Sequence, residues 1–524
     1  MRLSHSCRVY LYRRSVFVAL ALAALLCRAE MRPGPGQYFA IEVVDDQTGR
    51  GVPMVELKTT GSICYYTDSN GLIAFYEPGL MNREVWFSVS SHGYEFPADA
   101  FGSRGVKLDT RPGTTSRIKI KRLNIAERLY RITGQGIYRD TFLLGKKQPI
   151  AQPLLNAEVT GQDGVLNAIY RGKLYWFYGD TTRASYVLGN FSMTGATTEL
   201  PDKIDPSAGF VLHYFTRGDG FVRAMAPMEG EGVVWLFGLV VLPDETGRER
   251  MLAYYQRRQG MGAILEDGFV AYNDEKEQFE KLKGVPLNPT VFPQGFPFRA
   301  AGGDGVEYIY FSAPYPALRV KADWKSYLDL SSYESYTCLK PGSAETDKEN
   351  AVLDRDASGK LVWAWKKNAA PLNPKVQDEW VKAGRMRVEE SPFRLKDANT
   401  EKPVLLSNCS CCWNRYRQRY IMIASEVNGA TMLGEVWYGE SDHPEGPWTK
   451  ARKIITHANK PGDAHDFYNP VQHSFFDRDG GRVIYLEGSY VNTFSGNPHT
   501  TPYYEYNQIM YRLDLADPRL GAVR

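Results

Sequence analysis

Hydrophobic and polar positions alternate in short runs near the start of the chain, which predicts β-strands. Turn residues separate these runs, as in 45–51 and in the tight turn Asp68-Ser69-Asn70-Gly71. Short strands at near-regular spacing are typical of an all-β sandwich, which we place at residues 38–123. The predicted strands are Tyr38–Val44, Val52–Lys58, Leu72–Tyr76, Val85–Ser90 and Arg117–Lys121.

A second pattern begins near residue 149, where an apolar and aromatic strand recurs, often just after a glycine turn. The recurrences are roughly 60 residues apart, longer than the ~40–45 residues of a WD40 blade. This spacing fits four-stranded blades with long loops, so we predict a β-propeller over residues 149–520, with five blades favoured over six. An ordinary large sandwich or barrel is the other interpretation. The recurring strands are Leu174–Tyr178, Val233–Phe237, Glu307–Phe311, Leu361–Trp365, Tyr420–Ala424 and Val483–Glu487.

Three segments refine this organisation. Residues 125–129 in the connector are expected to form a short helix. The stretch 377–382 also has a helical pattern, so the strand at Leu361 is assigned either to a blade or to an insertion. Residues 509–515 are expected to form the last strand, pairing with the first blade.

The N-terminus has the pattern of an export signal. Arg8, Arg13 and Arg14 precede the apolar run Val16–Cys27, whose 12 residues fall short of the ~20 that a transmembrane helix needs. We predict a signal peptide at residues 1–29, cut after Ala29, and a mature chain that is periplasmic or extracellular and has no integral membrane segment. An internal anchor or a buried helix is the alternative.

Composition supports a large folded core. The 524 residues are 43% hydrophobic and 23% charged. Residues 1–29 hold five Arg and no acid, so their removal changes the net charge from +3 to −2. No clustered Lys/Arg stripe stands out, and we therefore expect no nucleic-acid partner.

Five cysteines remain after that cut, three of them in the run Cys409-Ser410-Cys411-Cys412. A zinc site usually needs a second ligand pair at regular spacing, and the sequence offers none. We expect packed small residues or a disulfide at this run. No cofactor is required, although a divalent cation could bind.

Two acids form the strongest candidate for chemistry. Asp163 lies in a Gly-flanked turn and Asp180 ends the strand Leu174–Tyr178 after Gly179, so the two flank one predicted hairpin and can end close together. Glycoside hydrolysis needs such a pair, one carboxyl group to protonate the leaving oxygen and one to attack or to activate water. The alternative is that both acids only cap backbone N–H groups in turns.

Further candidates lie toward the C-terminus. The run 463–473 is dense in His, Asp, Tyr and Asn, which suits hydrogen bonds to sugar hydroxyls, metal ligation, or a structural polar loop. Glu487 follows three apolar residues, and because a lone buried acid is costly we expect it to face a cleft or a partner. Tyrosines of the run 497–507 could stack on sugars or pack at an edge. The predicted substrate-binding residues are Tyr468, Asn469, His465, His473 and Tyr504.

The string TGQDG…GKLYWFYGDT, which contains both acids, resembles the opening blade of the bacterial endo-D-arabinanase-like glycoside hydrolases, long known only as a domain of unknown function. The resemblance implies a five-bladed propeller and makes Asp163 and Asp180 the functional acids. The phrase WYGESDHPEGPWTKARKI (437–454) resembles an outer-blade phrase of arabinanase-type propeller hydrolases.

The N-terminal strings VVDDQTGRGVPMVEL and YTDSNGLIAFYEPG resemble transthyretin-like or carboxypeptidase-regulatory-like sandwiches. Such modules are usually accessory, and nothing in residues 38–123 resembles a catalytic group.

These observations predict an exported glycoside hydrolase that acts on a poly- or oligosaccharide, with Asp163, Asp180 and Glu487 as catalytic acids. Two alternatives stay open. One is a non-catalytic glycan-binding propeller. The other is a polysaccharide lyase that would use Tyr468, His465 or His473 as base.

Overall fold

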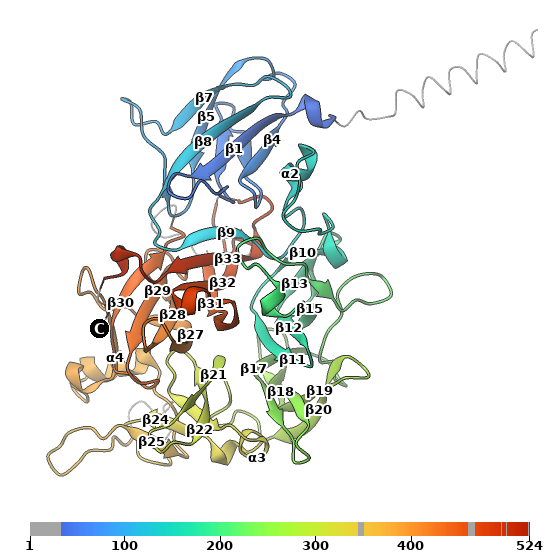
Figure 1. The fold of residues 1–524 in the computed structure, drawn as a ribbon. Coiled ribbons are helices and arrows are strands. Elements are labelled where there is room, and N and C mark those ends of the chain that lie inside the picture. Colours follow the sequence, from blue (N-terminus) through green and yellow to red (C-terminus); the bar gives the residue numbers. More distant parts are fainter. Residues whose placement is uncertain are drawn as a thin grey trace, which may run out of the picture.

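The computed structural model describes residues 33–343, 351–458, 467–493, 495–498, 500–521 and 523. The predicted signal peptide and His465 lie outside these residues. The molecule is all-β, with short helices between strands, and forms a smaller lobe from the N-terminal strands and a larger lobe from the rest (Figure 1). No helix in the described ranges is long and apolar enough to cross a membrane.

The smaller lobe is built from two four-stranded sheets, ordered β4-β1-β8-β6 and β3-β2-β5-β7. Buried apolar residues of both sheets form one core between them, for example Phe75 and Phe87, whose rings meet edge to face at 5.1 Å. The strands are β1 (Phe39–Asp45), β2 (Glu56–Thr59), β3 (Cys64–Tyr66), β4 (Leu72–Phe75), β5 (Glu84–Ser90), β6 (Tyr94–Glu95), β7 (Gly105–Asp109) and β8 (Thr115–Arg122).

The first part of the larger lobe holds a three-stranded sheet, β10-β13-β14, and the four-stranded sheets β11-β12-β15-β16 and β17-β18-β19-β20. Apolar side chains of successive sheets pack face to face, as sheets with hydrophobic faces require. The strands are β10 (Val159–Gln162), β11 (Leu166–Tyr170), β12 (Lys173–Tyr178), β13 (Thr181–Arg183), β14 (Tyr186–Asn190), β15 (Thr194–Thr198), β16 (His213–Tyr214), β17 (Val233–Pro243), β18 (Glu249–Arg258), β19 (Ile264–Asn273) and β20 (Gln278–Val285).

The second part holds the sheets β21-β22-β23-β24-β25, β26-β30-β29-β28-β27 and β31-β32-β33-β9. Its strands are β21 (Phe296–Ala301), β22 (Glu307–Ser312), β23 (Leu318–Lys321), β24 (Glu334–Thr337), β25 (Ala364–Lys367), β26 (Phe393–Asp397), β27 (Leu406–Asn414), β28 (Arg419–Glu426), β29 (Val436–Ser441), β30 (Trp448–Ile455), β31 (Phe467–Gln472), β32 (Val483–Val491), β33 (Tyr506–Asp514) and, from earlier in the chain, β9 (Glu127–Arg131).

The edge strands β11, β17, β21, β27 and β31 of five successive sheets contact one another in that order. They lie around a common centre in Figure 1. The loops at one end of these strands therefore converge, and this end carries the candidate site.

The expected helix at residues 125–129 is wrong. Residues 127–131 instead form the strand β9, which pairs antiparallel with β33 and is buried along its whole length. The backbone N–H groups of Ile125 and Ala126 both donate to the carbonyl of Ile454. Tertiary pairing therefore overrides the local pattern. The last strand was expected at residues 509–515, pairing with the first blade. It is β33, and it pairs with β32 and β9 instead.

The segment after β24 is an insertion rather than a regular sheet. Leu361 makes only an isolated bridge with Arg355, and the strand β25 begins later than expected. The helical pattern at 377–382 is confirmed within α4 (Pro374–Lys382), which Asn373 caps. The other α-helices of the described residues are α2 (Arg139–Leu143) and α3 (Trp324–Tyr327).

The five cysteines of the described residues are all free thiols, so the expected disulfide is not found there. Cys409 and Cys411 are buried in an apolar cluster. This agrees with their interpretation as packed small residues.

Candidate active site

The strands β10 and β13 bring the two predicted acids together. Gln162, which precedes Asp163, pairs with Thr181, which follows Asp180. The backbone N–H of Asp180 donates to Oδ1 of Asp163 at 2.9 Å, and the N–H of Asp163 donates to the carbonyl of Asp180 at 3.3 Å. The acids therefore lie side by side at the base of the β11–β12 hairpin.

Two glycines make this geometry possible. A Cβ on Gly179 would lie 2.5 Å from Oδ1 of Asp163, where the carboxylate now accepts its hydrogen bond from the backbone. A Cβ on Gly161 would lie 2.1 Å from the carbonyl oxygen of Tyr506, so a side chain there would push β33 away from β10. The glycines of the Gly-Gln-Asp and Gly-Asp-Thr strings thus allow close approach around Asp163.

Two tyrosines hold the other side of the Asp163 carboxylate. The hydroxyl of Tyr468 donates to Oδ2 of Asp163, and Tyr506 also hydrogen-bonds this carboxylate. Tyr468 is the second residue of β31, and Tyr506 is the first of β33. Asp163 therefore accepts hydrogen bonds from one backbone N–H and two phenols.

The two carboxyl groups differ in environment. Burial raises the pKa of Asp163, and hydrogen bonds from Tyr468, Tyr506 and the N–H of Asp180 oppose this rise. Burial and then the charge of Asp163 raise the pKa of Asp180 to about 7, against one hydrogen bond from Trp235. Because the donors gather on Asp163, a proton shared by the pair resides on Asp180 near neutral pH.

The acids open into a cavity of about 440 Å³ at the converging ends of the inner strands. This volume is in the range of ligand pockets, and most of the wall is apolar. The cavity is lined by Asp163, Gly164, Val165, Leu166, Gly179, Asp180, Met193, Trp235, Leu236, Phe237, Met261, Gln294, Gly295, Phe296, Asn408, Tyr468 and Asn469.

The structure also places Asn469 at this cavity. A bulge shifts the register of β31 after Tyr468, and Asn469 takes a left-handed conformation with a φ of 49°. Its Oδ1 accepts a hydrogen bond from Nδ2 of Asn408 at 2.5 Å. A positive φ is uncommon for a residue with a side chain, and such backbone strain is concentrated at functional sites.

Trp235 is a cavity residue that the sequence reasoning missed. It lies in β17, within a strand that the sequence marked only as a repeat element. Its indole hydrogen-bonds Asp180, and its ring contacts Phe191 edge to face at 5.9 Å. The guanidinium of Arg258 lies 5.4 Å from its ring centroid. Trp235 was missed because the sequence reasoning looked for polar residues, whereas this contact to Asp180 comes from an aromatic side chain within a strand.

Glu487 was expected to face a cleft or a partner, and the structure gives it a partner away from the cavity, so its prediction as a catalytic acid is wrong. Its side chain is fully buried in β32, which pairs with strands on both sides. It lies 3.5 Å from Nε2 of His473. Ser489, two residues on, accepts a hydrogen bond from the N–H of Gly164 beside the site. Since a strand advances ~3.3 Å per residue, Glu487 lies roughly 7 Å deeper than that contact.

The prediction that His473 lines the sugar site is also wrong. Its side chain is fully buried, with its ring 5.2 Å from Trp176 and Nδ1 3.2 Å from Nδ2 of Asn167. Two apolar aromatics follow it in the chain, Phe475 and Phe476, and both pack on its ring. It is a core histidine of the larger lobe.

Tyr504 was predicted at the sugar site and is instead buried between the lobes. Its hydroxyl donates to the carbonyl of Thr67 in the smaller lobe at 2.7 Å, and Arg131 lies over its ring at 4.8 Å. Tyr506, two positions further on, is also buried, and its side chain hydrogen-bonds the Asp163 carboxylate. His465 lies outside the described residues.

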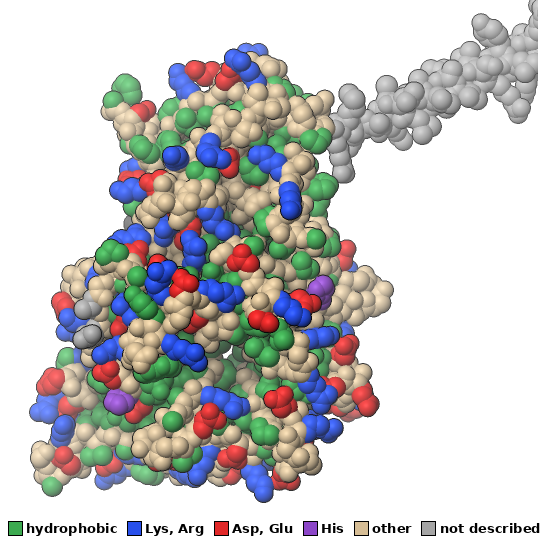
Figure 2. Space-filling view, viewed as in Figure 1, with side chains coloured by type: hydrophobic (Ala, Val, Ile, Leu, Met, Phe, Trp, Pro, Cys, Tyr) green, Lys and Arg blue, Asp and Glu red, His purple; other side chains and the backbone are tan. Residues whose placement is uncertain are grey.

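No group of three or more His, Cys, Asp and Glu that could hold a metal ion occurs among the residues the structure describes. The face shown in Figure 2 mixes acidic and basic side chains. The larger lobe is hollowed near its centre there, and hydrophobic side chains surround the hollow.

No protein-family profile matches the chain, and no curated protein matches it. Among solved structures, the chain is similar to the GH43_1 enzyme from Xanthomonas citri complexed with xylose. The identity is 12%, the TM-score is 0.34, and the match covers 71% of this chain and 91% of that one.

It is also similar to the exo-β-1,3-galactanase from Phanerochaete chrysosporium with galactose, at 11% identity and a TM-score of 0.34, over 68% of this chain and 61% of that one. TM-scores this low support no argument about function, which rests on the residues of the cavity.

Proposed function

We propose that this protein is a glycoside hydrolase that cleaves a poly- or oligosaccharide. The observation that carries the proposal is a pair of carboxyl groups, Asp163 and Asp180, that share one cavity in unequal environments. Glycosidic cleavage needs one carboxyl group that is protonated and one that is ionised at the same pH. The unequal donors around the two acids supply that difference.

Asp180 is the general acid of this proposal. Its pKa, raised to about 7, keeps the carboxyl group protonated in part of the population near neutral pH. A group with a pKa near the working pH donates a proton most effectively. The proton passes from Asp180 to the glycosidic oxygen as the bond to the anomeric carbon breaks.

Asp163 is the ionised partner, either as nucleophile at the anomeric carbon or as base toward water. The donors Tyr468, Tyr506 and the N–H of Asp180 favour its charged form. NMR can identify the anomer that is released first, and this distinguishes retention through the nucleophile from inversion through water.

The cavity wall fits a neutral sugar. Trp235 and Phe296 offer aromatic faces, and Asn408, Asn469 and Gln294 offer amide groups that can bond hydroxyls. The described lining residues carry no Lys or Arg, so nothing among them would neutralise a uronate carboxylate. This favours hydrolysis over the lyase alternative.

The sheets that surround the inner strands are consistent with a five-bladed propeller, closed by pairing of β9 with β33. We further propose that the protein is exported, as the N-terminal pattern predicts. The glycan-binding alternative is favoured only if the pair of acids proves to be without catalytic effect.

A panel of neutral and acidic polysaccharides tests the proposal, with arabinans included because of the sequence resemblance. We expect new reducing ends from a neutral glycan, without near-ultraviolet absorbance of an unsaturated product. Absorbance on a uronate polymer would favour the lyase. Binding without any cleavage would favour the glycan receptor.

A further inference from the structure

The two tyrosines that hold Asp163 lie next to residues that contact the smaller lobe. Tyr504, two positions before Tyr506, donates its hydroxyl to the carbonyl of Thr67 at 2.7 Å and is 2% exposed. Tyr503, just before Tyr504, takes a φ of 70°, and its carbonyl accepts a hydrogen bond from Nδ2 of Asn507 at 3.1 Å. The segment is therefore fixed at one end by the β-sandwich and at the other by Asp163.

Tyr468 has a similar connection. Its neighbour Phe467 stacks on His457, with ring centroids 4.4 Å apart and planes within 13°. His457 in turn meets His92 of the β-sandwich, edge to face at 5.8 Å. The ring of His92 also lies 5.7 Å from Tyr490, which pairs with Phe467 across β31 and β32.

The contact between the lobes is extensive and buried. Arg128 of β9 is 1% exposed and donates to the carbonyls of Pro53 and His92 and to the hydroxyl of Ser91. The Oγ of Ser69 accepts a hydrogen bond from the backbone N–H of Arg131 at 3.1 Å. Buried charges that are tied to carbonyls of the other lobe indicate a fixed contact rather than a mobile one.

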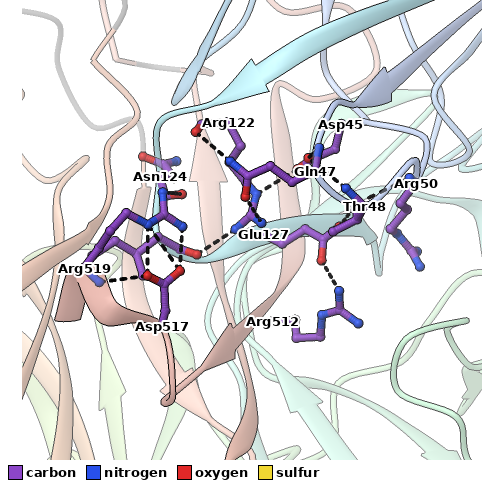
Figure 3. Close-up of polar contacts among 11 residues, drawn as sticks. Asp45, Gln47, Thr48, Arg50, Arg122, Asn124, Glu127, Arg512, Asp517 and Arg519 are labelled. Atoms are coloured by element: carbon purple, nitrogen blue, oxygen red, sulfur yellow. Dashed lines mark hydrogen bonds and ion pairs between the residues drawn. The ribbon is translucent and has the colours of Figure 1, made fainter.

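A second polar network joins the lobes at the outer edge of the same sheet (Figure 3). The hydroxyl of Thr48 donates to Glu127 at 2.7 Å, and Arg512 pairs with the same carboxylate. Arg122 pairs with Asp45 at 2.7 Å and also donates to the carbonyl of Ile125. Side chains from β1, β8, β9 and β33 thus meet in one cluster.

We propose that the β-sandwich is part of the active site and that Tyr504 is the positioning residue. The β-sandwich fixes the first residues of β31 and β33, the strands whose Tyr468 and Tyr506 bind Asp163. The catalytic meaning of Asp163 rests on the proposed function, whereas the contact itself does not. Loss of the Tyr504 contact lets Tyr506 and then Tyr468 move away from the carboxylate, so Asp163 loses donors that favour its charged form.

The test is Tyr504→Phe, with Tyr504→Ala as a stronger variant. In protein labelled with ¹³C at the aspartate carboxyl carbon, the signals of Asp163 and Asp180 are assigned by their loss in the two Asp→Asn variants. We expect Tyr504→Phe to raise the apparent pKa of Asp163 by about half a unit or more. Hydrogen exchange should also become faster in the peptides that contain Tyr468 and Tyr506.

Tyr333→Phe is the matched control. Tyr333 is buried to 1% exposure and donates its hydroxyl to a backbone carbonyl, that of Tyr327, at 2.8 Å. It makes the same kind of bond far from the lobe contact, so we expect no change at Asp163.

An unchanged titration of Asp163 in folded Tyr504→Phe would overturn the inference, as would an equal shift in Tyr333→Phe. If Tyr504→Ala fails to fold, the Phe variant still decides. The titration needs no turnover. A shift of Asp163 in a protein that cleaves no glycan would therefore refute the proposed function and leave the inference standing.

Discussion

Tyr468→Phe removes one of the two phenol donors from Asp163 and leaves the ring in place. A hydrogen bond to a charged group contributes about 1.5–3 kcal/mol. At about 1.4 kcal/mol per pKa unit, its loss should raise the apparent pKa of Asp163 by roughly 1–2 units. Asp163 works in its ionised form, so a higher pKa removes activity from the acidic side of the profile.

The assay is kcat/KM against pH on a cleaved glycan, because this profile reports the ionisations of the free enzyme. We expect the acidic limb to move to higher pH by roughly 1–2 units while the rate recovers above the new limb. Tyr333→Phe should leave the limb in place. A uniform fall in kcat/KM with an unmoved acidic limb would refute the assignment of Tyr468 as a donor that tunes Asp163.

Three further predictions follow from single contacts. Gly179→Ala would place its Cβ 2.5 Å from Oδ1 of Asp163 and should abolish hydrolysis in the same assay, whereas Gly218→Ala, with open space at its Cβ, should not. Trp235→Ala should raise KM by roughly tenfold in steady-state kinetics, through loss of a sugar-stacking face, and retention of the wild-type KM would exclude that face. Burial lowers the pKa of His457 from 6.5 to about 3, so the folded state binds fewer protons than the unfolded state between these values. Stability should fall by about 3–5 kcal/mol as the pH drops through that window, measured by urea unfolding, and His457→Gln should reduce this loss.

The sequence predicted the pair of acids because their proximity is a local property. Asp163 and Asp180 flank one hairpin, and the return of a strand brings its two ends together whatever the rest of the chain does. The depth of Glu487 could not be predicted in this way. It depends on how β31 and β33 cover β32 from both sides, which follows only from long-range pairing.

The aromatic run at 497–507 shows a similar limit. The sequence marked its tyrosines as candidates for sugar contact, yet Tyr504 lies against the β-sandwich and Tyr506 against Asp163. The residue type indicates which contacts a tyrosine can make, but the position of each ring depends on the tertiary fold. Trp235 was not predicted as a site residue because an aromatic residue in a hydrophobic strand has the same sequence pattern as a core residue.

The β-sandwich was expected to be an accessory module. That expectation came from the sequence of its own strands, which carries no information about its contacts with the larger lobe. The contacts that matter arise from residues scattered over the chain, such as His92, Arg128 and Tyr504. Spacing along the sequence does not reveal a surface of this kind.

The central claim is that Asp163 and Asp180 together cleave a glycosidic bond. Reducing-end release should therefore be compared for wild type, Asp163→Asn, Asp180→Asn and the turn variant Asp304→Asn, whose carboxylate accepts from the N–H of Val306 and the hydroxyl of Tyr308. We expect each of the first two variants to lose activity by roughly 10³-fold or more with an unchanged melting temperature, and Asp304→Asn to keep it. Full activity in both Asp163→Asn and Asp180→Asn would contradict the account.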